Sequence, residues 1–224
     1  MLSISRYQYY LSWFFDQTLL QTQSELHPNL KLMLSNGRLR LEAEQAIYSF
    51  EDKYEVFFSP FREMNFERQQ FRHVLVLGFG LGCVPLMLTQ NFGQQQAQYI
   101  GVEIDPVIID LAQQCLPEKV WQQCKVYQAD ALTFASQHPQ QYDLIAVDVF
   151  EDMTTPLPFR SSHFLEQLSE QLLPNGYLCY NTLAFDRSTI NESMAFFNDV
   201  FSKVFPNAKL FPVVGNQLLV GQKI

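Results

Sequence analysis

The sequence predicts a doubly wound α/β fold, with a mostly parallel sheet of seven strands and an antiparallel last strand. From residue 73 onward, continuous apolar runs that suit buried parallel strands alternate with helical segments. Near the end of the chain, Gly215 and Asn216 separate two short apolar runs and predict a tight turn. At least one of the last two strands should therefore run antiparallel. The length of 224 residues suits one such domain with a small appendage.

The elements of this fold follow the apolar pattern along the chain. We expect strands at residues 74–77, 99–103, 125–127, 142–147, 177–180, 210–213 and 218–220. We expect helices after the first strand through residue 88, and over 106–115, 161–173 and 190–205. Pro106 suits a first helical turn, and the run Pro174, Asn175 and Gly176 should end the helix that begins at residue 161.

The first 68 residues are expected to form a small extension to a main domain over 69–224. Near-helical spacing predicts an amphipathic helix with apolar positions at Tyr7, Tyr10, Leu11, Phe14 and Leu19. Asn36 and Gly37 between two short extended runs predict a β-hairpin. Residues 45–58 could continue this small sheet or begin a helix. The aromatic N-terminal stretch should pack on the domain or across a homodimer interface.

Composition narrows the choice of partners and compartment. A net charge of −8 and a pI near 4.9 argue against nucleic acid or an anionic membrane as partner. They suit a cationic small substrate, although an acidic surface also serves solubility. The apolar run over 7–20 is interrupted by Asp16, so we expect neither a signal peptide nor a membrane span. Four cysteines without metal-ligand spacing predict a cytoplasmic protein with reduced thiols and no metal site.

The sharpest local motif directly follows the first buried strand. It reads Gly78-Phe79-Gly80-Leu81-Gly82. Glycines at this place let a ligand approach the backbone and let the next helix begin beneath it. The spacing differs from the Gly-x-Gly-x-x-Gly of nicotinamide-binding loops, which disfavours a dehydrogenase.

Acidic residues end the next three strands. Glu103 lies 21 residues beyond Gly82, where a carboxylate can accept both hydrogen bonds of a ribose diol. Asp130, followed by Ala131, could accept a hydrogen bond from the adenine amine, and Asp148 ends the fourth strand. Glu103 and Asp130 could each cap a helix instead. Because open α/β sheets bind ligands at the carboxyl ends of their strands, the combination predicts a nucleotide site.

These motifs resemble the class I S-adenosylmethionine-dependent transferases, and most of all their spermidine synthase branch. The matching segments are 74–82, 101–106, 130–131 and 142–148, and the resemblance extends over roughly residues 30–224. Val76 is apolar, as in that branch, where most methyltransferases carry an acidic residue. The resemblance implies a Rossmann-like sheet and S-adenosylmethionine, or its decarboxylated form, as cofactor. The implied cofactor-binding residues are Gly78, Phe79, Gly80, Gly82, Glu103, Ile104, Asp130, Ala131 and Asp148.

The sequence departs from that branch at three places. Spermidine synthases have an Asp, which holds the aminopropyl ammonium, where this chain has Leu81. Their catalytic Asp-x-x-Asp-Pro becomes a stretch that begins at Asp148, with Glu151 at the second acidic place and Asp152 beside it. Their hairpin Gln is replaced by Arg40. These departures put the decarboxylated donor and a diamine acceptor in doubt.

The chemistry needs little more than alignment of a nucleophile and removal of its proton, since a sulfonium is an excellent leaving group. Asp148 could hold an acceptor amine, and Glu151 or Asp152 could serve as base if burial raises its pKa. A solvated acidic loop is the alternative for this stretch. Tyr48 is a candidate substrate contact or a core residue.

Three functions remain open on the sequence. We favour a spermidine-synthase-like transferase that moves an aminopropyl or methyl group to a small, cationic amine acceptor. The first rival is a small-molecule methyltransferase, because Leu81 does not oppose a donor that keeps its carboxylate. The second rival is a nucleoside-binding homologue without turnover.

Overall fold

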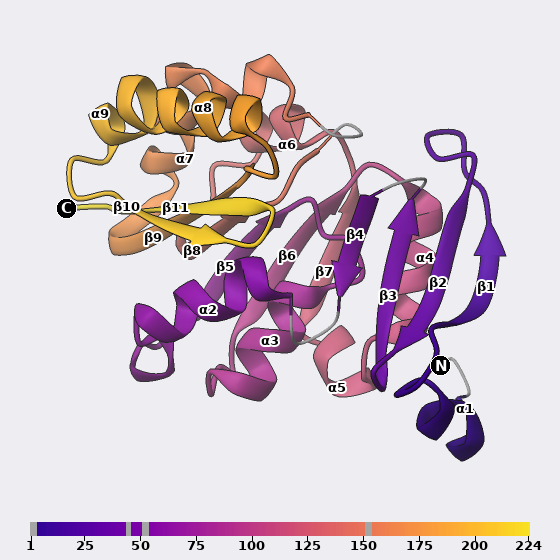
Figure 1. Ribbon diagram of the computed structural model, residues 1–224. Coiled ribbons are helices and arrows are strands. Elements are labelled where there is room, and N and C mark those ends of the chain that lie inside the picture. The colour runs from indigo at the N-terminus through magenta and orange to yellow at the C-terminus, as the bar shows by residue number, and fades with distance from the viewer. Residues whose placement is uncertain (1–3, 44–45, 51–53, 151–153) are drawn as a thin grey trace.

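The computed structural model describes residues 4–43, 46–50, 54–150 and 154–224, with the backbone path alone for 46–50. Figure 1 shows two sheets. The strands of the large sheet are β5 (His73–Leu77), β6 (Gln98–Glu103), β7 (Cys124–Gln128), β8 (Tyr142–Val147), β9 (Leu172–Leu183), β10 (Lys209–Val213) and β11 (Asn216–Gln222). Those of the small sheet are β1 (Gln17–Thr22), β2 (Leu30–Ser35), β3 (Arg38–Ala43) and β4 (Ala46–Phe50).

The large sheet has the strand order β10-β11-β9-β8-β5-β6-β7. Pairing is parallel between β5 and β6, β6 and β7, β5 and β8, and β8 and β9. Only β11 among these seven strands runs against the others, because it pairs antiparallel with both β9 and β10. The predicted doubly wound, Rossmann-like α/β fold with an antiparallel last strand is confirmed. The order reverses between β5 and β8, which is where such sheets open a crevice for a ligand.

Helices cover both faces of the large sheet (Figure 1). One face carries α2 (Glu55–Glu63), η2 (Phe66–Arg68), α3 (Cys83–Asn91), α4 (Pro106–Cys115) and α5 (Glu118–Trp121). The other carries α6 (Ala131–Gln137), η3 (Leu157–Arg160), α7 (Ser162–Glu170), α8 (Arg187–Phe196), the π-helical η4 (Phe197–Phe201) and α9 (Ser202–Val204). The described part of the chain has no helix both long and apolar enough to span a membrane.

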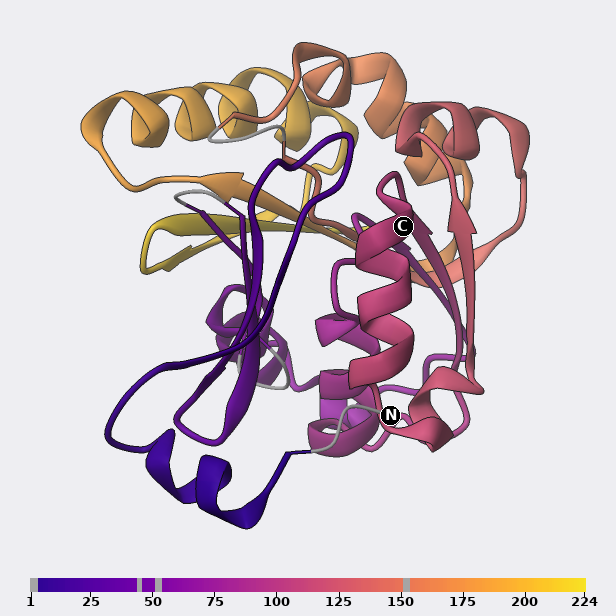
Figure 2. The same cartoon turned by 90° about the vertical axis from the view of Figure 1, so that its right-hand side faces the viewer.

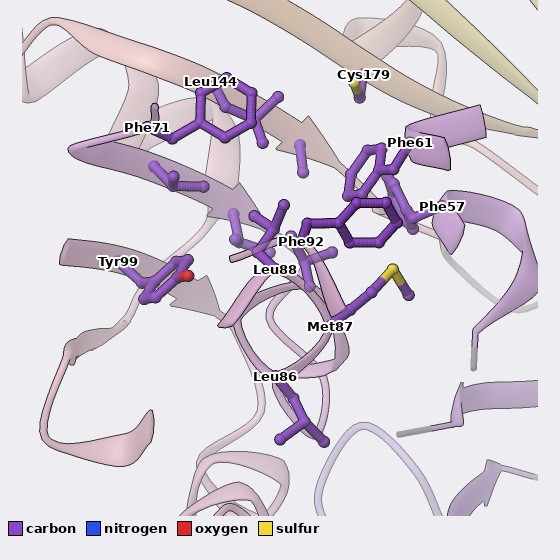
Figure 3. Close-up of a cluster of buried hydrophobic side chains, with 14 of the residues drawn as sticks. Phe57, Phe61, Phe71, Leu86, Met87, Leu88, Phe92, Tyr99, Leu144 and Cys179 are labelled. Atoms are coloured by element: carbon purple, nitrogen blue, oxygen red, sulfur yellow. The ribbon is translucent and has the colours of Figure 1, made fainter. Parts of the chain in front are cut away.

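Much of the aromatic content lies in the core on the first of these faces. Figure 3 shows Phe57 and Phe61 of α2 beside Phe92, which follows α3. The Phe61 ring meets that of Phe92 edge-on with a centroid separation of 5.7 Å and stacks on Phe66 at 4.7 Å. Such pairs add to the burial energy of the rings. These Phe residues build the contact between α2, α3 and the sheet.

The small sheet stands beside α4 (Figure 2). Along β2 and β3 the side chains alternate between buried and partly buried, as expected for a sheet with one covered face. Leu32 and Leu41 on the covered face pack in one apolar cluster with Ile108 and Leu111 of α4. Leu81, from the loop after β5, joins that cluster and is 3% exposed. The small sheet is thus attached to the loop that follows β5 and to α4, which follows β6.

The short helix α1 (Arg6–Leu11) is fixed to the turn of the predicted hairpin. The backbone N–H of Asn36 donates to the Ser12 carbonyl, and that of Gly37 to the Ser12 hydroxyl, each at 2.8 Å. Asn36 and Gly37 both adopt left-handed backbone angles, as the predicted two-residue turn requires. The hairpin prediction is confirmed.

Two predicted helices extend too far. The first ends at Leu11, and Leu19 lies in β1, where it packs against the apolar cluster of the small sheet. The helix expected over 161–173 ends at Glu170, because Leu172 already pairs with Tyr142 of β8. The turn residues 174–176 lie in β9, where the pairing with β8 shifts register. Tertiary pairing overrides the local pattern at both places.

Residues 45–58 contain both of the alternatives that the sequence left open. They form β4 and, after residues outside the described part of the chain, the start of α2. The short helices α5 and α6 were not predicted. Both are only a few residues long, too short for their periodicity to stand out.

Replacing Leu81 with Asp should destabilise the protein by at least about 3 kcal/mol, because it buries an unpaired carboxylate between the small sheet and α4. Leu81→Met, which keeps the volume and polarity, should cost less than about 1.5 kcal/mol. Urea unfolding of the two variants checks this. Equal midpoints for wild type and Leu81→Asp would contradict the packing described for this residue.

Candidate active site

The glycine loop after β5 is shaped by three left-handed residues. The φ angles of Gly78, Gly80 and Gly82 are 83°, 54° and 77°. A Cβ on Gly78 would overlap the carbonyl oxygen of Asp148, so the loop can pass beside the end of β8 only with glycine there. Gly82 precedes the first residue of α3 and forms its N-cap without a side chain.

Phe79 contributes its backbone to the site and its side chain to the core. The ring is 2% exposed and lies against Gly101 of β6, where any Cβ would overlap it. The backbone N–H of Gly78 and that of Phe79 both donate to the Val102 carbonyl at 3.0 Å. These contacts tie the loop to the end of β6.

A cavity of about 400 Å³ opens at the carboxyl ends of the strands. It brings together eight of the nine predicted cofactor-binding residues, which are Gly78, Phe79, Gly80, Glu103, Ile104, Asp130, Ala131 and Asp148. Gly82 is the ninth and serves α3 as described. Among the described residues, Glu103, Asp130 and Asp148 bring three carboxylates to the cavity, which therefore suits a cationic ligand.

Glu103 is the most firmly held of the three carboxylates. One oxygen accepts hydrogen bonds from the backbone N–H groups of Ile104 (2.9 Å) and Asp105 (3.2 Å), and the other accepts from Gly80 (3.0 Å). Only 6% of the residue is exposed. Burial raises the pKa of Glu103, and the three backbone donors oppose that rise. The hydrogen bond to Gly80 also fixes the carboxylate to the glycine loop.

Asp130 and Ile104 offer two further kinds of contact. One oxygen of Asp130 caps α6 by accepting from the backbone N–H of Thr133 at 2.8 Å. The alternative of a helix cap is therefore realised, although the residue also lines the cavity. Ile104 is 49% exposed, unusual for an isoleucine, and it lies on the cavity wall. It presents an apolar surface on which a flat base could pack.

Asp148 is the centre of a polar network at the other end of the cavity. Its Oδ1 accepts a hydrogen bond of 2.8 Å from the amide of Asn181, and the hydroxyl of Tyr54 also donates to its carboxylate. Burial of the carboxylate raises the pKa of Asp148 to about 7, and the nearby charge of Glu103 adds to the rise. Burial raises the pKa of Tyr54 as well. Asp148 can therefore exchange a proton near neutral pH.

The small sheet supplies part of the cavity wall through the turn between β1 and β2. Leu26 and His27 of this turn line the cavity. The turn is held where the Ser24 hydroxyl donates to the carboxylate of Asp105, which also caps α4 by accepting from Val107. Asp105 is fully buried, so this attachment point lies beside Glu103 inside the protein.

Sequence reasoning missed several residues of the site. Tyr54 and Asn181 sit in segments without any motif, and each reaches Asp148 only through the fold. Leu26 and His27 lie in a turn of the extension, about fifty residues before the glycine loop. The segment around Tyr54 was expected only to continue the small sheet or to begin a helix, and neither expectation reveals a contact with Asp148 at the end of β8.

The remaining predicted catalytic residues fall largely outside what the structure describes. Glu151 and Asp152 lie outside the described residues, and so does the side chain of Tyr48, whose backbone belongs to β4. Arg40, which replaces the hairpin Gln of the spermidine synthases, pairs with Asp16 at 2.7 Å and with Glu42 at 2.6 Å. It is thus engaged within the small sheet and the segment that leads into it.

Comparison with known proteins identifies the fold and the family of this chain. The fold is that of the class I methyltransferases and spermidine synthases. Residues 64–220 match the Spermine/spermidine synthase domain, and the chain belongs to that family. A probable polyamine aminopropyl transferase of Bifidobacterium longum (strain NCC 2705) is 32% identical over 135 residues, 59% of this chain and 29% of that protein. The chain therefore aligns with less than a third of that relative's length.

Two solved structures show the same fold. A spermidine synthase from Thermotoga maritima has a TM-score of 0.69 with 15% identity, over 93% of this chain and 73% of the other. Human methyltransferase-like protein 13, in complex with SAH, has a TM-score of 0.57 with 24% identity, over 72% of this chain and 75% of the other. At these identities the likeness concerns the fold alone.

The raised pKa of Asp148 should make folding less favourable as pH rises. Between the usual value of 3.8 and about 7, the unfolded chain loses the Asp148 proton while the folded chain keeps it, so stability falls across this window. In Asp148→Asn, residue 148 does not titrate, so this fall in stability with pH is absent. Its stability relative to wild type should increase from pH 4 to pH 7, by up to roughly 4 kcal/mol, and then stay constant.

Chemical denaturation at several pH values measures this difference. Asp110→Asn, on the exposed surface of α4, corrects for the loss of one charge. A constant difference between Asp148→Asn and wild type across pH 4–7 would show that Asp148 titrates in its ordinary range.

Proposed function

We propose that this chain is a transferase that binds S-adenosylmethionine or a close derivative and transfers an aminopropyl or methyl group to a small amine. The observation that supports this most directly is the single cavity that joins Glu103, Asp130 and Asp148 beside the glycine loop. A cationic sulfonium nucleoside suits a site with three carboxylates. Membership in the Spermine/spermidine synthase domain family adds to the argument.

In this proposal the nucleoside lies along the ends of β5, β6 and β7. Glu103 holds the ribose hydroxyls, while its backbone donors keep the carboxylate in place. Asp130 accepts from the adenine amine with the oxygen that does not cap α6, and Ile104 packs against the base. The backbone of the glycine loop allows the donor to come close, since no side chain fills that space.

The acceptor half of the site centres on Asp148. A bound sulfonium supplies a good leaving group, so the protein needs to orient the amine and accept its proton. Asp148 orients the amine nitrogen by hydrogen bonding, and its pKa of about 7 allows it to take a proton at neutral pH. Tyr54 holds the carboxylate in position. Glu151 and Asp152 remain candidates for the same role as base.

Two residues, Leu81 and His27, bear on whether the donor is S-adenosylmethionine or its decarboxylated form. Leu81, which stands where spermidine synthases hold an ammonium, packs with the small sheet and offers no charge. His27 lines the cavity and could pair with a donor carboxylate. Both features favour intact S-adenosylmethionine over its decarboxylated form, and so support methyl transfer as a second candidate. A nucleoside-binding homologue without turnover is the third.

Calorimetric binding tests the proposal and separates these candidates. S-adenosylmethionine, its decarboxylated form, methylthioadenosine and NAD are titrated side by side into the wild-type protein. We expect the adenosyl sulfonium or thioether ligands to bind and NAD not to bind. Preference for the decarboxylated form, with formation of an aminopropylated amine, would establish aminopropyl transfer. Absence of binding by all adenosyl ligands would refute the proposal.

Asp130→Asn should weaken binding of methylthioadenosine about tenfold or more without unfolding the protein. Asn caps a helix as well as Asp, so α6 should remain intact. With its oxygen used in the cap, its NH₂ would face the adenine amine, donor against donor. Methylthioinosine, which lacks that amine, provides the matched control. Equal loss of affinity for both nucleosides would argue against contact between Asp130 and the amine.

We also propose that the chain forms a homodimer through its aromatic N-terminal segment. Tyr7, Tyr10, Phe14 and Phe15 are each between 67% and 78% exposed, which is unusual for aromatic residues on a surface free of partners. The proposal gives these side chains an apolar environment in a second copy.

Light scattering should give twice the chain mass of 26.1 kDa. Replacing Phe14 and Phe15 together with Ser should produce a folded monomer, since their side chains are exposed in the single chain. Its thermal midpoint should fall only by the stabilisation that the dimer contact supplies. Leu157→Ser, at another exposed apolar position, should remain dimeric. A wild-type monomer would overturn this proposal.

A further inference from the structure

Two asparagines form a chain of hydrogen bonds that ends on Asp148. Asn181 of β9 is fully buried and donates from Nδ2 to Oδ1 of Asp148 at 2.8 Å. The Oδ1 of Asn181 accepts in turn from Nδ2 of Asn216 at 3.0 Å. Asn216 begins β11 directly after the turn that joins it to β10. The antiparallel end of the sheet is thereby linked to the site.

These hydrogen bonds run from Asn216 through Asn181 to Asp148, and the chemistry of the amide group sets that direction. An amide has donors at one end and an acceptor at the other, and a flipped Asn181 would turn its oxygen toward the Asp148 carboxylate. The donor of Asn216 fixes the Asn181 oxygen on its own side. Asn181 must then present its NH₂ group to Asp148, which is a contact that suits an ionised carboxylate.

We propose that Asn216, acting through Asn181, is a positioning residue that sets the rotamer and the charge state of Asp148 for proton transfer. The inference rests on the proposed function, in which Asp148 orients an acceptor amine and accepts its proton. According to this inference, the hairpin of β10 and β11 contributes to catalysis. None of the described residues that line the cavity comes from that hairpin.

The charged and titratable groups around Asp148 act in opposite directions. Glu103, from the end of β6, and burial both favour the protonated form. Tyr54, at the start of α2, and Asn181 favour the ionised form by donating hydrogen bonds. Cys83, at the start of α3, lies close enough to influence Tyr54. Turning the Asn181 amide around would remove one stabilising donor and bring an oxygen to the carboxylate.

Asn216→Asp is the sharpest variant, because it replaces the donor with an acceptor and keeps the shape. Asn181 should then turn its NH₂ toward residue 216 and its oxygen toward Asp148. The pKa of Asp148 should rise by about one unit or more, partly through the added charge. Asn216→Ala removes the donor to the Asn181 oxygen without adding charge, while Asn181 still contacts Tyr54 and Asp148. It should therefore raise the pKa in the same direction by a smaller amount. Asn198→Asp, on the exposed surface of η4, controls for charge alone.

The first measurement is a carboxyl NMR titration of the protein without ligand, with Asp148→Asn used to assign the signal. It reports on Asp148 whether or not the chain is an active transferase. An upward shift in both Asn216 variants, absent from Asn198→Asp, supports the inference. An unchanged Asp148 titration in folded Asn216→Asp would overturn it.

The second measurement is the pH dependence of kcat/KM for amine transfer. Asn216→Asp should move the acidic limb upward by the same amount as the NMR pKa, while the rate at high pH stays close to wild type. A uniform loss of rate at every pH would point to a structural role and overturn the positioning role. A shifted NMR titration in a protein that binds no adenosyl ligand would instead refute the proposed function and leave the hydrogen-bond relay established.

Discussion

The close approach of the glycine loop to the ends of β6 and β8 is the constraint on which the site depends. Gly78 fits against the carbonyl of Asp148 because it has no Cβ, and the backbone of Gly78 and Phe79 bonds to Val102. Glu103 then reaches the N–H of Gly80. A bulkier loop would separate the ends of these strands. The carboxylates of Glu103 and Asp148 would no longer share a cavity, and their electrostatic coupling would be lost.

The small sheet contributes to the site, although its residues lie far from the glycine loop in the sequence. It packs on α4 through an apolar cluster that includes Leu81 of the glycine loop. The same sheet extends the turn with Leu26 and His27 over the cavity and attaches it through Ser24 to Asp105. Leu81 is therefore a packing residue between the small sheet and α4.

Much of the fold could be predicted from the sequence, because buried parallel strands and capped helices have local signatures. The strands around the glycine loop and the helix over 106–115 follow directly from apolar runs and from Pro106. Errors occurred where pairing with a distant strand decided the conformation. Leu19 entered β1, and residues 172–176 joined β9 against the local signal of a helix end.

The sequence by itself determined the class of fold and the residues at the strand ends that line most of the cavity. These residues follow consecutive strands, and parallel strands bring their carboxyl ends together by geometry alone. Only the tertiary structure decided the neighbours of Asp148. Tyr54 comes from the start of α2, and Asn181 meets Asp148 because β9 pairs with β8. Asn216 meets Asn181 because β11 folds back antiparallel beside β9. Hydrogen bonds between side chains so far apart depend on position in space, and neither spacing nor periodicity encodes that position.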